Sequence, residues 1–173
     1  MSSTMCVLHI RTKAAHWYPS GCSPKPQVRR KKSAFAAGAV AGAVAGLLSG
    51  VPSTVHALVT GGDPLAAARA AGNLLLPADA RPTALLAAGG LAHVVASLGW
   101  GTVLTMAVRR TSLSPLAVGL AGGAAIAAVD LGLLAHGPFG RRWPLIRALP
   151  VLPQVADHLA FGAIAGAVLR RRG

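Results

Sequence analysis

Four ionisable residues stand inside otherwise apolar stretches of this chain: His93, Asp130, Asp157 and His158. Ionisable groups are costly inside a bilayer, where a central aspartate costs about 2.5–3.5 kcal/mol on insertion scales. Depth in the membrane can be counted at about 1.5 Å per residue, starting from the end of each apolar stretch that faces outside the cell. On this count Asp130, Asp157 and His158 lie about 9–10 Å deep and His93 about 15 Å deep. The sequence therefore predicts a polar intramembrane cluster in the outer half of the membrane.

Carboxylates beside imidazoles can do several kinds of chemistry. They can hold a helix bundle together, at about 0.6 kcal/mol per polar bridge, or relay protons in a low-dielectric site. Two histidines facing each other could ligate haem or a metal ion, but no helix carries a preformed pair of ligands, so no metal ligand is assigned. The sequence contains no nucleophile elbow, phosphate loop or dinucleotide-binding motif, which favours a protein that is not an enzyme.

The composition excludes an ordinary soluble domain. The chain has 173 residues, of which 53% are hydrophobic and 12% are charged, about half the usual charged share. Its 17 Lys and Arg against 4 Asp give a formal net charge of +13, and Glu is absent. The basic residues flank apolar runs, so we expect a lipid bilayer as the partner and no nucleic acid.

Four runs nearly free of charge predict an all-α integral membrane bundle of four transmembrane helices. We expect these helices near residues 34–58, 83–107, 115–136 and 151–169, within a domain spanning 33–173. Each run reaches the roughly 20 residues that a spanning helix needs and lacks the polar stripe of a soluble helix. Pro52 predicts a kink or an early end of the first helix.

Residues 1–32 differ in composition and predict a disordered basic tail. A second interpretation is a mis-called start, because Val28 followed by four basic residues resembles a natural bacterial beginning. A third interpretation is that the first apolar run is a cleaved signal peptide, although three further spans follow it. We expect an uncleaved first span.

The basic residues predict the orientation. Twelve of the 17 Lys and Arg residues fall on one side of the membrane, in the segment before the first helix, in the connection between the second and third helices and in the C-terminal tail. Five fall on the other side: Arg69, Arg81, Arg141, Arg142 and Arg147. The sequence therefore predicts a multi-pass protein of the plasma membrane with both termini in the cytoplasm.

Glycines at a four-residue spacing mark the packing face of the first helix: Gly38, Gly42, Gly46 and Gly50. Small residues let helix backbones approach closely in lipid, where hydrophobic drive between helices is weak. This face predicts close helix packing, within one chain, in a homo-oligomer or against a membrane partner.

Two stretches carry a resemblance to known proteins: 48–57, which reads LSGVPSTVHA, and 149–158, which reads LPVLPQVADH. The chain resembles a small family of uncharacterised four-span membrane proteins of actinobacterial type, over residues 34–170. The resemblance implies a membrane location and four spans, and it implies no activity.

The function expected from the sequence is a structural or accessory membrane subunit. Two alternatives stay open: a small proton- or cation-linked transporter-like protein, and a haem- or metal-binding redox subunit.

Overall fold

The computed structural model describes residues 27–138 and 140–171, with side chains from residue 34 onward. All regular elements in this part of the chain are helices. In chain order they are α1 (Gln27–Ser49), α2 (Val51–Val59), α3 (Ala66–Gly72), α4 (Pro82–Arg110), α5 (Pro115–Ala127), the π-helix η1 (Ala128–Ala135), the 3₁₀ turn η2 (Gly140–Arg142), α6 (Pro144–Arg147) and α7 (Val151–Arg170).

The prediction of four membrane-length helices is confirmed. Four helical segments are long and apolar enough to cross a membrane: Ala34–Val59, Pro82–Arg110, Pro115–Ala135 and Val151–Arg170. Large apolar side chains point outward from them, including Leu47, which is 85% exposed, and Leu152, which is 83% exposed. Outward-facing apolar side chains suit a lipid environment and would be a liability in water. Most of the predicted tail, residues 1–26, lies outside the described residues, while residues 27–32, predicted to be disordered, form the start of α1.

The first span has the early end that Pro52 predicts. It is broken at Gly50, so that α1 ends at Ser49 and α2 begins at Val51. Proline has no N–H to donate, and its ring crowds the carbonyl four residues earlier, here that of Leu48. Pro52 therefore cannot continue α1 as a regular α-helix. The break therefore falls two residues before the proline that causes it.

Two further features were not predicted from the sequence. The third span changes from an α-helix to a π-helix at Ala128, and the π-helical turns carry Asp130. Two short helices, α3 and α6, lie in the connections between the predicted spans. α3 consists of the seven residues AAARAAG, whose alanines favour a helix that is too short to show helical periodicity.

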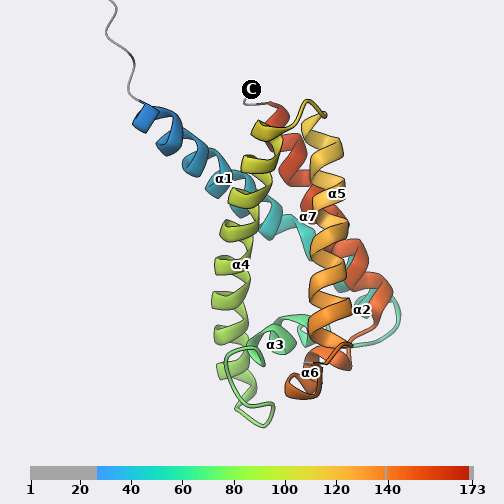
Figure 1. The fold of residues 1–173 in the computed structure, drawn as a ribbon. Coiled ribbons are helices and arrows are strands. Elements are labelled where there is room, and N and C mark those ends of the chain that lie inside the picture. The colour runs from blue at the N-terminus through green and yellow to red at the C-terminus, as the bar shows by residue number, and fades with distance from the viewer. Residues whose placement is uncertain (1–26, 139, 172–173) are drawn as a thin grey trace, which may run out of the picture.

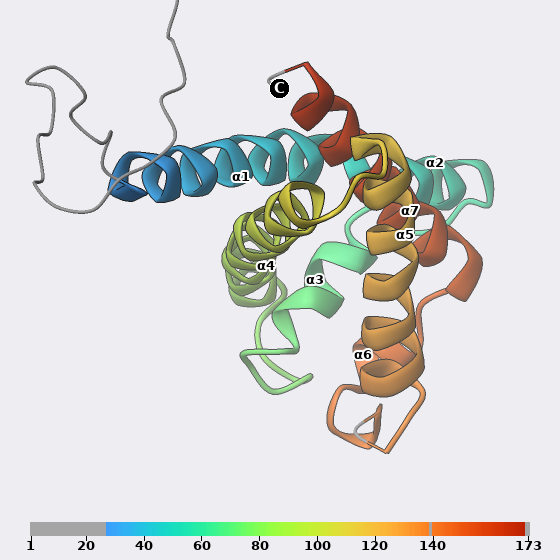
Figure 2. The ribbon, with the colours of Figure 1, turned by 45° about the horizontal axis from the view of Figure 1, so that its top comes forward.

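The spans form two closely packed pairs, α1 with α4 and α5 with α7, and α1 also packs against α7. The start of α1, the α4–α5 turn and the end of α7 share one end of the bundle, while α3 and α6 lie at the other end (Figure 1). Seen after a 45° turn, α1 runs out sideways from the bundle past α4 (Figure 2). The start of α1 and the end of α7 therefore lie at the same end of the bundle.

Three glycines of the predicted ladder form the contact between α1 and α4. A Cβ atom at Gly38 would lie 2.7 Å from the Cα atom of Thr102, and one at Gly42 would overlap the carbonyl oxygen of Ser97. A Cβ atom at Gly46 would lie 2.5 Å from the hydroxyl of Ser97. These contacts lie within one chain. By contrast, Gly50 sits at the break and has open space around it.

The second pair of helices uses the same device. A Cβ atom at Gly119 would overlap the carbonyl of Gly162, and one at Gly123 would overlap the carbonyl of His158. The short helix α3 likewise docks on α4, where Gly72 and Gly89 each face backbone atoms of the other helix. Backbone contact at glycines thus fixes the positions of α4 and α7, the two helices that carry His93 and His158.

Candidate intramembrane site

A cavity of about 490 Å³ lies between the two helix pairs. α4 supplies one wall, and α5 with η1 supplies the facing wall. α7 and the break between α1 and α2 close the third side, while α3 and α6 contribute residues at the end of the bundle away from the chain termini. α4 packs chiefly against α1 and α3, and α5 chiefly against α7, so the two facing walls contact each other much less than they contact these neighbours.

All four residues of the predicted polar cluster line this cavity: His93 on α4, Asp130 on η1, and Asp157 and His158 on α7. They do not form one buried cluster. His93 is exposed and the other three are half-buried. Their hydrogen bonds instead divide them into separate contacts with different partners, which indicates different roles.

Asp130 and His158 bind each other. The distance from His158 Nε2 to Asp130 Oδ2 is 3.1 Å, and the other ring nitrogen, Nδ1, lies 2.6 Å from the carbonyl oxygen of Gln154. A carbonyl can only accept a hydrogen bond, so Nδ1 carries a proton. One further proton must then lie between Nε2 and Oδ2, either as imidazolium and carboxylate or as neutral imidazole and carboxylic acid. The pair therefore shares one proton at the cavity wall.

His93 binds the backbone of the broken helix. Its Nε2 donates to the carbonyl oxygen of Gly46 over 2.8 Å. The last four carbonyls of a helix lack their usual partners, and Gly46 is the first of these four in α1. Inside a membrane such a group needs a partner from the protein, because lipid offers none. His93 therefore stabilises the end of α1.

Asp157 does the same for the start of α2. Its Oδ1 accepts the backbone N–H of Ser53 over 3.0 Å, and its Oδ2 accepts the hydroxyl of the same residue in a short hydrogen bond. The residue at the N-cap position, Gly50, has no side chain that could cap the helix. A carboxylate at the N-terminus of a helix satisfies a free N–H and interacts favourably with the helix dipole. Asp157 thus caps α2 from another span.

This cap gives a stability prediction. Asp157→Ala should lower the free energy of unfolding by about 1–2 kcal/mol, the usual cost of losing an N-cap. Asp157→Asn keeps an acceptor for the Ser53 N–H and should cost less than half as much. Thermal unfolding of both variants in the same detergent measures the difference. Equal losses for the two variants would show that Asp157 does not act as a cap.

Ser53 and the carbonyl of Gln154 were not predicted as partners of these four residues. Ser53 is a short polar residue next to Pro52, and its capping role depends on a helix break whose position was not predicted. Gln154 stands four residues before His158, a spacing that places its carbonyl beside the histidine ring on a helix.

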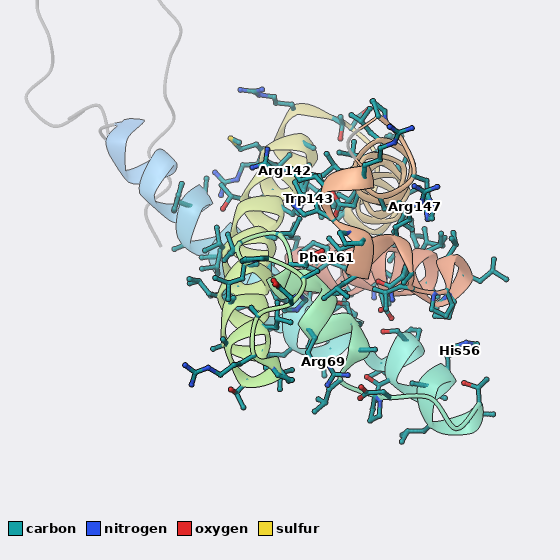
Figure 3. All side chains as sticks on the ribbon, turned by 90° about the horizontal axis from the view of Figure 1, so that it is seen from below. His56, Arg69, Arg142, Trp143, Arg147 and Phe161 are labelled. Carbon is teal, nitrogen blue, oxygen red and sulfur yellow. The ribbon has the colours of Figure 1, made fainter. Side chains whose placement is uncertain are left out.

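Trp100 and Phe161 also line the cavity. The labelled side chains in Figure 3 place Phe161 toward the middle of the bundle, with Arg142, Trp143 and Arg147 around α6.

Metal binding has no preformed site in the part of the chain that the structure describes. There, no group of three or more His, Cys, Asp or Glu side chains is arranged to hold a metal ion. His93 Nε2 and both nitrogens of His158 are engaged with protein oxygens. The chemistry that the arrangement can perform is the binding and release of a proton by Asp130 and His158.

Comparison with known proteins adds no further assignment. No family model, no curated protein and no solved structure matches this chain.

Proposed function

We propose that this multi-pass membrane protein is a small proton-linked transporter-like protein. The observation that carries the proposal is the Asp130–His158 pair, which shares one proton on the wall of a cavity of about 490 Å³. Cavities of roughly 300–1,000 Å³ hold small organic molecules. A protonatable pair at such a cavity can link binding of a solute to release of a proton.

A structural or accessory role accounts most directly for two of the four polar residues. His93 and Asp157 bind backbone groups of the broken first span, as a structural role requires. Asp130 does not bind the backbone of another helix, and its side chain is 37% exposed. The π-helical turns that carry it also support a functional role, because π-helical segments inside α-helices often occur at functional sites.

The broken first span supports the same proposal. Interrupted helices occur at the binding sites of membrane transporters, where the ends of the half-helices face the site. Here Ser49, Gly50 and Ser53 of the break line the cavity. Asp157 and His93 bind the backbone on the two sides of this break, at Ser53 and Gly46.

We also propose that the protein lies in the plasma membrane with both termini in the cytoplasm. The excess of basic residues at the end of the bundle that holds the chain termini supports this orientation. A reporter that is active only in the cytoplasm should be active when fused after Gly173 and silent when fused after Asp79. The opposite pattern would reverse the orientation.

Charge movement after a pH step tests the function. Purified protein in phosphatidylcholine liposomes is adsorbed on a solid-supported membrane, and the solution is stepped from about pH 8 to about pH 6, where histidine titrates. A transient charge displacement larger than that of protein-free liposomes is expected, because protons enter the membrane-embedded site. A response equal to that of protein-free liposomes would contradict the proposal.

A further inference from the structure

The cavity wall has a charge opposite in sign to that of the chain. The chain carries a net charge of +13 and contains only four acidic residues, yet two of these, Asp130 and Asp157, line the cavity. The lining, as far as the structure describes it, includes no lysine or arginine. A cavity lined by carboxylates inside a low-dielectric protein attracts a positively charged ligand.

The two carboxylates differ in how much of their hydrogen-bonding capacity is used. Both oxygens of Asp157 accept hydrogen bonds from Ser53. Asp130 uses Oδ2 for His158, and its Oδ1 makes no hydrogen bond within the described residues. A carboxylate oxygen that faces a cavity without a donor is a ready acceptor for an ammonium group. Asp130 is therefore the carboxylate at which a cation would bind.

The rest of the lining suits an apolar body. Leucine and isoleucine side chains of η1 and α6 face the cavity, among them Leu131, Leu134 and Ile146. Two aromatic residues, Trp100 and Phe161, join them. Aromatic faces also stabilise an ammonium ion that lies within about 6 Å of the ring centre. The polar groups thus stand among mostly apolar lining residues.

We propose that the cavity binds a small lipophilic organic cation, an amine with an apolar body, whose ammonium group pairs with Asp130 and displaces one proton from His158. This inference rests on the proposed proton linkage and names its substrate class. Before binding, imidazolium and carboxylate form an ion pair. On binding, the imidazolium gives its Nε2 proton to water, and the ammonium group replaces it beside Asp130. One positive charge enters as one proton leaves, so the charge of the site is unchanged.

Few other charged groups face Asp130. His158 and Asp157 do so from α7, and His93 lines the same cavity from α4. The break between α1 and α2 contributes only neutral groups to the lining, and Arg69 of α3 is paired with Asp63. The arginines of η2 and α6 are exposed and do not line the cavity. Competition between ammonium and proton should therefore weaken amine binding as the pH falls.

Fluorescence of Trp100 provides the test. In protein with Trp17→Phe and Trp143→Phe, Trp100 is the remaining tryptophan and lines the cavity. 2-Phenylethylamine should quench or shift its fluorescence with saturation. The neutral analogue 2-phenylethanol and the anionic analogue 3-phenylpropanoate should bind at least about tenfold more weakly, because only a cation can replace the imidazolium as the partner of the Asp130 carboxylate. Equal binding of the three compounds would overturn the proposal.

Variants locate the site. In the same tryptophan background, Asp130→Asn should lose at least about tenfold in amine affinity, whereas Asp130→Glu and the exposed control Asp79→Asn should retain binding. Unchanged affinity in Asp130→Asn would also overturn the proposal, and circular dichroism of each variant shows that it is folded. A charge movement after a pH step without amine binding would reject the substrate class alone. Saturable amine binding without that charge movement would reject the proton linkage.

Discussion

Gly42→Leu is expected to prevent the bundle from folding, or to lower its free energy of unfolding by at least about 3 kcal/mol. Even a single Cβ atom at position 42 would overlap the carbonyl oxygen of Ser97 on α4, and the clashing atoms belong to the backbone, which cannot rotate away. A leucine adds three more carbon atoms at the same place. The yield of monodisperse protein after membrane extraction and its thermal midpoint measure the effect.

Gly50→Leu is the matched control, because this glycine shares the four-residue spacing and lacks the contact. A Cβ atom at Gly50 meets no other atom within 4 Å, and its φ of −77° suits any residue. We expect this variant to be recovered in amounts close to wild type. Similar losses for both variants would mean that glycine spacing alone, rather than the α1–α4 contact, decides stability.

Asp130→Asn should reduce the charge movement after a pH step to that of protein-free liposomes. The amide cannot take up a proton in this range, and it removes the negative charge that stabilises an imidazolium at His158. His158→Gln should have the same effect, because it removes the other half of the pair. The amplitude of the transient current, normalised to the amount of protein in the liposomes, gives the comparison.

Two aspartate variants separate this effect from general damage. Asp79→Asn lies in the connection before α4 and should keep the full response. Asp157→Asn retains a cap for α2 and should keep most of it, because Asp157 does not share the proton of the pair. Loss of the response in all four variants would assign the signal to protein stability rather than to Asp130 and His158.

The spans could be predicted from the sequence because charge is excluded from lipid-facing helices. The runs without charge around 83–107 and 151–169 therefore coincide with α4 and α7 to within a few residues. The break at Gly50 was only partly predicted, since Pro52 forbids a continuous helix without fixing where the chain turns. The π-helix at Ala128–Ala135 has no signal in the sequence, because its extra residue per turn depends on packing rather than on composition.

The residues of the candidate site were predicted from the sequence, but most of their hydrogen-bond partners were not. His93, Asp130, Asp157 and His158 were found because ionisable groups are rare in apolar stretches. Two of their partners are backbone groups, the Gly46 carbonyl and the Ser53 N–H, and these become available only where a helix is interrupted. Gly50 shows the same dependence on the helix break. It has the four-residue spacing of the other glycines, but it makes no contact with α4 because the helix breaks there.

Infrared difference spectroscopy of the protein in lipid bilayers tests most directly the claim that Asp130 and His158 share an exchangeable proton. Spectra recorded on either side of the histidine titration range report changes at imidazole and carboxyl groups. The wild type and Asp157→Asn should both show a pair of bands that is absent from Asp130→Asn, since only the last variant removes the shared proton. Identical difference spectra for wild type and Asp130→Asn would contradict the account.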